Sequence, residues 1–294
     1  MKIVQSYWSK PALAGRQTVQ NRSSGGWLEQ KYHYMGWALS CLQFRKFYAH
    51  LELVTDQWGR HVFIDRLRLP YTHVREELDS LNPYHPDLWA LGKLRAYQLQ
   101  QEPFLHVDGD VIIWRPFAAE LVLAPLVAQN EDVGFSFYEE SLAEIAQHFS
   151  YIPPVVKRDR TVKPLRSVNA GILGGTDTAF FKRYTDEAFR FVDRNLAHLS
   201  QVTPGLFNAV YEQYLFSCLA REAGQPVAFY QTDRLYSYGD FERYFDASAT
   251  TGLLHPIGLA KKKPSLNQEI EFRLRKDYPE YYFRILDLLK ADAI

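Results

Sequence analysis

Two aspartates, Asp108 and Asp110, stand two residues apart between the apolar runs Phe104–Val107 and Val111–Ile113. The runs predict two strands, the first of them buried. Gly109 has no side chain, so the backbone can turn there and bring both carboxylates toward a common point. Two carboxylates at the end of a strand suit a divalent cation that keeps coordination positions open for phosphate oxygens.

The same residues have two other interpretations. An Asp-Gly turn between two strands would leave both carboxylates in solvent, with no ligand to bind. The segment Asp108–Val111 also fits the strand-DxDx(T/V) motif of haloacid dehalogenase phosphatases, in which the first aspartate attacks a phosphate. The metal-site interpretation corresponds to the DxD motif of nucleotide-sugar transferases. Three letters alone leave these alternatives open.

Bulk composition is that of an ordinary globular protein. The 294 residues include 47% hydrophobic and 23% charged residues, and 34 basic residues balance 34 acidic ones. A net charge of zero gives no electrostatic reason to expect a nucleic-acid partner. Cys41 and Cys218 are the two cysteines, which favours a reducing compartment over a disulfide scaffold. Without a visible signal peptide or membrane-spanning run, we expect a cytoplasmic protein.

Strand and helix patterns alternate along the chain, which predicts an α/β fold whose sheet is mainly parallel and flanked by helices. We expect strands at 2–6, 50–55, 104–107, 133–138, 167–175 and 227–230. Helices are expected at 27–48, 60–69, 87–100, 139–149, 176–195 and 207–221, with two more after Pro264. The Pro-rich, basic segment 151–166 is expected to be a loop.

Polar residues follow three of these strands: Gln5-Ser6-Tyr7, Thr55-Asp56 and Asp108-Gly109-Asp110. In parallel sheets, ligands bind beyond the carboxyl ends of the strands, so these residues could form one site. About a hundred residues precede Asp108, whereas haloacid dehalogenase phosphatases carry their motif on the first strand of the core. This position counts against the phosphatase interpretation.

Three further motifs occur in a fixed order: Asn169-Ala170-Gly171, Glu212-Gln213, and the HxxGxxK segment His255–Lys261. Together with the DxD, this ordered set covers most of the chain and resembles glycosyltransferase family 8, which has the GT-A fold. The stretch Trp89–Lys93 is also similar to an uncharacterised bacterial family labelled glycosyltransferase-like. The chain departs from family 8 after the last motif, where Lys262-Lys263-Pro264 replaces Pro-Trp, and in its opening residues.

The resemblance implies roles for individual residues. It assigns a divalent metal to Asp108, Asp110 and His255, and the imidazole favours Mn²⁺ over Mg²⁺. It implies nucleotide contacts from Asp108, Lys93, Gly258 and Lys261. The polar strand ends add Gln5, Ser6, Tyr7 and Asp56 as candidate nucleotide contacts. It places Gly109, Asn169, Ala170 and Gly171 at the donor sugar. Finally, it implies catalytic roles for Glu212 and Gln213.

The function that the resemblance implies is metal-dependent transfer of a hexose from a UDP-sugar, with retention, to a glycan, lipid or peptide acceptor. We expect a catalytic domain at 1–263 and a packed helical extension at 264–294, in which Tyr281, Tyr282, Ile285 and Leu289 could also meet a membrane surface. The alternatives are a haloacid dehalogenase-type phosphatase with Asp108 as nucleophile, and a non-catalytic sugar-nucleotide-binding protein. The acceptor and the oligomeric state are not predicted.

Overall fold

The computed structural model describes residues 1–14, 24–232 and 246–294, which fall into two compact units. Within these ranges, residues 2–86, 108–116 and 246–294 form one unit, here called the N-terminal unit. Residues 87–107 and 117–232 form the other, here called the middle unit. The predicted division at residue 263 remains a prediction.

Three parallel strands form the sheet of the N-terminal unit, in the order β3-β2-β1. They are β1 (Lys2–Tyr7), β2 (Leu51–Thr55) and β3 (His73–Glu76). Every residue of β2, the central strand of the three, is buried. Tyr7 pairs with Thr55, so β1 and β2 end at the same edge and their polar final residues lie together there.

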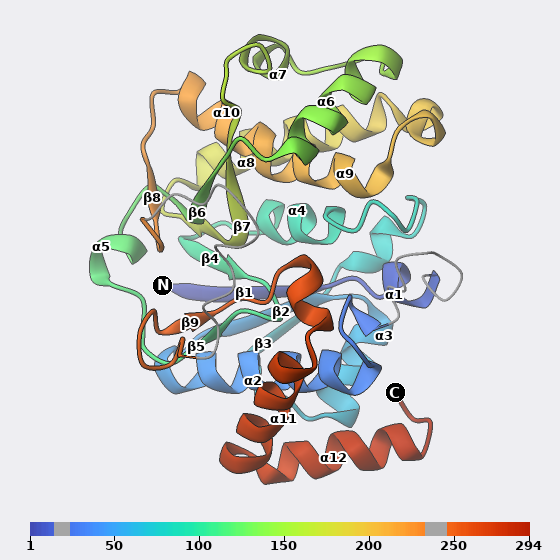
Figure 1. Cartoon of the computed structure of the whole chain (residues 1–294), viewed down its shortest axis with the longest axis vertical. Coiled ribbons are helices and arrows are strands. Elements are labelled where there is room, and N and C mark those ends of the chain that lie inside the picture. The colour runs from blue at the N-terminus through green and yellow to red at the C-terminus, as the bar shows by residue number, and fades with distance from the viewer. Residues whose placement is uncertain (15–23, 233–245) are drawn as a thin grey trace. The chain divides into compact units, whose positions relative to one another are not determined.

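Helix α2 (Gln30–Phe47) is the main helix of this unit, and its residues from Tyr32 to Phe44 are all buried. The C-terminal helices α11 (Pro264–Asp277) and α12 (Pro279–Lys290) pack against it (Figure 1). Tyr282 and Ile285 of α12 are buried, so these two side chains face the protein and not a membrane surface. The shorter helices are α1 (Lys10–Ala14), α3 (Gln57–Arg60), the π-helix η3 (His61–Arg66) and the 3₁₀ helix η4 (Leu78–Leu81).

A second, two-stranded sheet in the N-terminal unit joins two segments that are far apart in sequence. Strand β5 (Ile112–Ile113) pairs antiparallel with β9 (Leu253–Leu254). Each segment carries a predicted motif next to its strand: the DxD precedes β5, and the HxxGxxK segment follows β9. The 3₁₀ helix η8 (Gly258–Lys262) completes the second segment.

Four strands form the sheet of the middle unit, in the order β4-β7-β6-β8. Their bounds are β4 (Phe104–Val107), β6 (Leu126–Val133), β7 (Arg166–Gly175) and β8 (Val227–Phe229). Strand β7 pairs antiparallel with β4 and β6, and β6 pairs parallel with β8. The sheets therefore mix parallel and antiparallel pairs.

Helices before and after the strands complete the middle unit, and α8 packs on α4 and α10. Near the sheet, Phe104, Phe181, Tyr184 and Phe216 form a buried aromatic cluster with edge-to-face contacts. The helices are α4 (Leu91–Gln98), α5 (Ala119–Val122), α6 (Ser136–His148), α7 (Pro154–Asp159), α8 (Thr178–Asp193), the 3₁₀ helix η5 (Leu196–Gln201), α9 (Pro204–Ala209), the π-helix η6 (Val210–Tyr214) and α10 (Leu215–Glu222).

The structure confirms the α/β class with a mixed sheet and a helical C-terminus, but two local predictions were wrong. The strand expected at 133–138 ends at Val133, because Gly134 has a positive φ of 72° and α6 begins at Ser136. The loop expected at 151–166 contains α7, because Pro154 occupies its first position, where proline is well tolerated. Within the described ranges, no helix has both the length and the apolar character needed to cross a membrane.

Candidate metal and anion site

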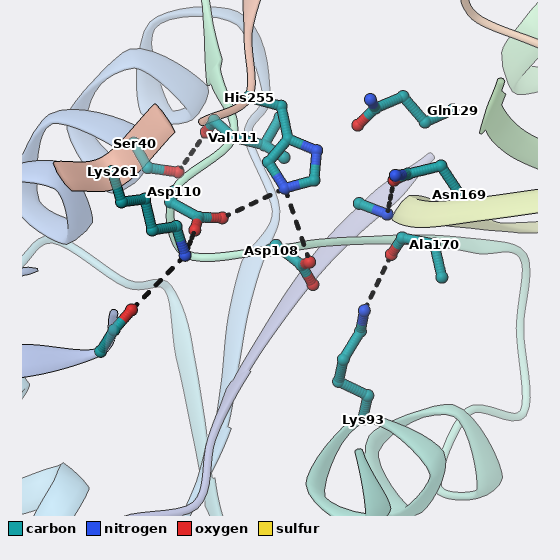
Figure 2. A network of polar contacts seen from close by, with 12 residues as sticks. Ser40, Lys93, Asp108, Asp110, Val111, Gln129, Asn169, Ala170, His255 and Lys261 are labelled. Carbon is teal, nitrogen blue, oxygen red and sulfur yellow. Dashed lines mark hydrogen bonds and ion pairs between the residues drawn. The ribbon is translucent and has the colours of Figure 1, made fainter. Parts of the chain in front are cut away.

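The N-terminal unit brings Asp108, Asp110 and His255 together, as Figure 2 shows. One ligand atom from each residue lies within 4.8 Å of the other two. His255 Nε2 is 3.5 Å from Asp110 Oδ1 and 3.9 Å from Asp108 Oδ2. Two carboxylates and one imidazole are a donor set that fits Mn²⁺ or another borderline divalent ion. The three predicted metal ligands therefore form a possible metal site.

Lys261, from η8, forms an ion pair with Oδ2 of Asp110 (Figure 2). Burial alone would raise the pKa of the Asp110 carboxyl, but the Lys261 ammonium and His255 outweigh burial and lower it below its usual value. Asp110 is therefore ionised at neutral pH and able to bind a cation. The predicted anion-binding residue Lys261 thus lies directly beside the candidate metal cluster.

Hydrogen bonds from two buried side chains hold the backbone of the DxD segment in place. Gln5, on β1, is fully buried, and its Nε2 donates to Asp108 O at 3.3 Å and to Ser40 Oγ at 2.9 Å. Ser40, on α2, donates in turn to Val111 O at 2.5 Å. The amide of Gln5 therefore positions the loop that carries the carboxylates, and the predicted contact of Gln5 with a nucleotide remains a prediction.

An aromatic residue sets the position of Gly109. A Cβ added at Gly109 would lie 2.2 Å from ring atoms of Trp37, so only glycine fits against this ring. Trp37 is itself fixed, because its Nε1 donates to Tyr71 Oη at 2.8 Å and Tyr71 donates to Gln5 Oε1 at 2.7 Å. Trp37, Tyr71 and Gln5 are thus linked by hydrogen bonds. Trp37 packs against Gly109, and Gln5 bonds the backbone carbonyl of Asp108.

Gly109→Ala should therefore displace the carboxylates without unfolding the unit. Loss of supporting residues around a metal typically weakens its binding by about 10–100-fold, and we expect a loss of that size for Mn²⁺. Calorimetry on the wild type, Gly109→Ala and the double variant Gly109→Ala with Trp37→Leu measures it. The double variant should recover part of the affinity because it makes room for the new methyl group. Wild-type affinity in Gly109→Ala would contradict the packing argument.

Asp56 and Tyr7, two more of the predicted nucleotide contacts, have partners within the protein. Asp56 is buried and accepts hydrogen bonds from Ser9 N at 2.6 Å and Gly59 N at 2.8 Å, which caps α3. Burial raises the pKa of its carboxyl despite these bonds.

The Tyr7 ring packs edge-on against Phe63, with centroids 4.8 Å apart. Ser6 is half-buried on β1, and Gly258 has a positive φ of 53° at the start of η8. Nucleotide contacts from these residues remain a prediction.

Within the middle unit, Lys93 and Glu212 form a buried ion pair, with Nζ and Oε1 2.6 Å apart. Lys93 Nζ also donates to Ala170 O at 2.9 Å (Figure 2), and Tyr97 Oη donates to Glu212 Oε1 at 3.1 Å. Glu212 is completely buried and lies on the π-helix η6, a kind of helical turn that is frequent at functional sites. Its carboxylate is placed to hold Lys93, and a catalytic role for it remains a prediction.

The predicted donor-sugar residues 169–171 lie on β7 of the middle unit. Asn169 is mostly buried, and its Oδ1 accepts from Gly171 N at 2.9 Å, so its side chain is fixed along its own strand. The catalytic candidate Gln213 is half-buried on η6, where its Oε1 accepts from Tyr138 Oη at 2.9 Å. Sugar contact by residues 169–171 and catalysis by Gln213 both remain predictions.

Asp132 adds a titratable group to the polar cluster around Gln213. Tyr138 Oη is 3.3 Å from Asp132 Oδ2, and Asn130 Nδ2 donates to Asp132 Oδ1 at 2.9 Å. Burial raises the pKa of Asp132 to about 6, against the effect of these hydrogen bonds. Below that pH the protonated carboxyl can donate a hydrogen bond of its own.

The raised pKa of Asp132 predicts a pH-dependent difference in stability from Asp132→Asn. Because the folded pKa lies above the unfolded one, the wild type loses stability as pH rises from about 4 to 6, and the variant does not. From pH 4.5 to pH 7.5, the difference in free energy of unfolding between the variant and the wild type should change by about 2 kcal/mol in favour of the variant. Urea unfolding at both pH values measures this, and a constant difference would mean that Asp132 titrates normally.

Sequence patterns did not identify the residues that support the Asp-Asp-His cluster, or the one that bonds Glu212 in the Lys93–Glu212 ion pair. Trp37 and Ser40 lie among the buried positions of α2, and Tyr71 follows the isolated Pro70. The one available signal was Ser40, a polar residue within a long buried helical segment, since buried hydroxyls require hydrogen-bond partners. For Tyr97, which bonds Glu212, helical spacing gave no indication of a polar role.

Fold and site together define an α/β protein with a candidate Asp-Asp-His metal site and a lysine on one of its carboxylates. The chain belongs to a family of unknown function, DUF6734, whose model matches residues 1–288. Among solved structures it is similar to the galactosyltransferase LgtC in complex with donor and acceptor sugar analogues, at 11% identity and a TM-score of 0.36 over 72% of this chain and 70% of that one. None of the curated proteins matches the chain.

Proposed function

We propose that this protein is a metal-dependent glycosyltransferase of the GT-A type that transfers a hexose from a UDP-sugar. The observation that carries the proposal is the meeting of the DxD and HxxGxxK segments: Asp108, Asp110 and His255 form one cluster, and Lys261 contacts Asp110. A cation site beside a fixed ammonium is suited to a ligand that bears several negative oxygens, as a nucleoside diphosphate does.

Asp108, Asp110 and His255 would hold the cation, which supplies Lewis-acid stabilisation of the departing diphosphate. Lys261 would bind the same phosphates, and Gly258, which has no side chain, would let the backbone approach them. The buried supports of the DxD segment keep the carboxylates in place before a ligand arrives, which lowers the cost of reorganisation on binding.

For the middle unit we propose that Asn169, Ala170 and Gly171 contact the donor sugar and that Glu212 and Gln213 act near the reacting carbon. Lys93 is buried with Glu212, so its contribution would be to orient that carboxylate and the carbonyl of Ala170. Retention at the anomeric carbon follows from the resemblance to family 8. A β-linked product from an α-linked donor, seen by NMR in the first minutes of reaction, would overturn the retaining assignment.

The cellular setting and acceptor belong to the same proposal. Cys41 and Cys218 are buried free thiols whose pKa values are raised by burial, which fits a reducing compartment such as the cytoplasm. We propose a glycan, lipid or peptide acceptor.

Thermal shift and two turnover assays separate the three candidate functions. A glycosyltransferase should be stabilised by UDP with Mn²⁺ and less by UDP with EDTA, should not hydrolyse p-nitrophenyl phosphate, and should release UDP from a UDP-hexose. Hydrolysis of p-nitrophenyl phosphate would favour the phosphatase with Asp108 as nucleophile. Stabilisation by UDP with no turnover of any UDP-hexose would favour a binding protein.

A further inference from the structure

The two oxygens of Asp110 face different groups. Oδ1 lies 3.5 Å from His255 Nε2, on the side of the candidate metal site, whereas Oδ2 forms the ion pair with Lys261 Nζ. The Asp110 side chain is only 14% exposed, so solvent screens its interactions weakly. One carboxylate therefore belongs to both the metal-binding cluster and the lysine.

Lys261 is held at this contact by several groups. Its backbone carbonyl accepts from Nδ2 of Asn267 at 2.8 Å, which ties η8 to this buried side chain of α11. Its ammonium is 5.7 Å from the centroid of the Trp27 ring and 3.5 Å from Gly25 O. The lysine side chain is 18% exposed, which distinguishes it from a solvated surface lysine.

The neighbouring lysine makes a different contact. Lys262 Nζ donates to Trp27 O at 2.6 Å, and so its charge is directed to a backbone carbonyl. Lys262 thus has the same charge and nearly the same place in the chain as Lys261, without the ion pair to Asp110. It is a matched control for the effect of removing a positive charge from η8.

A divalent cation held by Asp110 would be repelled by the Lys261 ammonium across the same carboxylate. The repulsion weakens cation binding for as long as both remain, and its effect is large at short range in a partly buried site. A diphosphate has enough negative oxygens to bind the cation and the ammonium at once, and it turns the repulsion between them into a shared attraction.

We propose that Lys261 couples the binding of the divalent cation to that of the diphosphate, an inference that rests on the proposed function of this site. Lys261 lowers the affinity for the cation alone and raises it when a diphosphate is present. The protein therefore takes up metal together with the nucleotide and holds free metal poorly. Because linkage is reciprocal, the metal increases the affinity for the diphosphate by the same factor.

Titration of Mn²⁺, followed by calorimetry and by the electron paramagnetic resonance signal of free Mn²⁺, tests the coupling in the full-length protein. The variants are Lys261→Met, which keeps the length of the side chain without its charge, Lys261→Arg, which keeps the charge, and Lys262→Met as the control. Each is titrated alone and with saturating UDP, with the direct binding of Mn²⁺ to UDP subtracted from a blank.

Without UDP, Lys261→Met should bind Mn²⁺ about ten-fold more tightly than the wild type, while Lys261→Arg and Lys262→Met should not differ from it. UDP should strengthen Mn²⁺ binding about ten-fold or more in the wild type and much less in Lys261→Met. Equal Mn²⁺ affinity of Lys261→Met and the wild type without UDP would overturn the proposal, as would equal strengthening by UDP in both.

Failure of the proposed function gives a different pattern. If the coupling is observed but no UDP-hexose is consumed, the inference stands and the glycosyltransferase assignment fails. If UDP-hexose is consumed and the Lys261 variants bind Mn²⁺ as the wild type does, the assignment stands and the inference fails. Absence of Mn²⁺ binding in the wild type and in every variant, with UDP as well as without it, would overturn both.

Discussion

Asp110→Asn should abolish Mn²⁺ binding in the presence of UDP and leave the protein folded. The substitution removes one of two carboxylates from the Asp-Asp-His cluster and the ion-pair partner of Lys261. Changing a residue that merely supports a metal ligand costs about 10–100-fold in affinity, so loss of a charged ligand should exceed about 100-fold. The free Mn²⁺ signal in paramagnetic resonance gives the affinity, and circular dichroism reports the fold.

Asp65→Asn is the matched control, because Asp65 belongs to the same unit and is half-exposed on η3 beside His61. It should bind Mn²⁺ as the wild type does. If Asp110→Asn kept an affinity within a few-fold of the wild type, Asp110 would not be a metal ligand, and its carboxylate would serve only the ion pair with Lys261.

Lys93→Met and Glu212→Leu should each destabilise the protein by about 3–5 kcal/mol, because each leaves its partner as a buried charge without its counter-ion. Glu212 is completely buried, and its Oε2 accepts no hydrogen bond from the described residues, so the carboxylate depends on its Oε1 contacts. The double variant removes both charges and should recover most of the stability.

Urea unfolding of the wild type, both single variants and the double variant forms a double-mutant cycle for Lys93 and Glu212. The expected interaction energy is at least about 2 kcal/mol. Additive losses in the double variant would mean that the ion pair contributes little and that the two residues act separately. Stable single variants would leave both side chains available for direct contacts with a donor.

The candidate metal cluster of Asp108, Asp110 and His255 could be predicted from sequence because its members belong to motifs with a fixed internal spacing. Asp108 and Asp110 flank a glycine, and His255, Gly258 and Lys261 occupy their positions in HxxGxxK. The meeting of these two segments depends on the short pairing of β5 with β9, which only the resemblance could anticipate. The cluster was therefore predicted by motif order, and its geometry comes from the structure.

The supports of the cluster could not be predicted because their roles depend on contacts between distant residues. Gln5 and Trp37 have no local pattern that distinguishes a loop-positioning amide or ring from a nucleotide contact or an ordinary core residue. The resemblance places Glu212 near a reacting carbon, and no sequence pattern indicated its ion pair with Lys93. Side-chain partners across a fold decide such roles, and single-sequence patterns do not report them.

Local structure was predictable where the apolar periodicity was long and unambiguous. The expected helix at 27–48 and strand at 167–175 correspond to α2 and β7 with small differences at their ends. The error at 133–138 came from apolar residues that alternate across Gly134, where the strand in fact gives way to a helix. Strand β3 was missed because it is short and mostly polar, with sequence His-Val-Arg-Glu.

The most direct test of the proposed metal and diphosphate site is a calorimetric titration of UDP into the wild-type protein, once with Mn²⁺ and once with EDTA. Asp108, Asp110 and His255 are proposed to bind the phosphates through a cation, with Lys261 as the protein's own phosphate contact. We predict measurable binding with Mn²⁺ and an affinity lower by a factor of about ten or more with EDTA. Equal affinity under both conditions would contradict a metal-dependent nucleotide site at these residues.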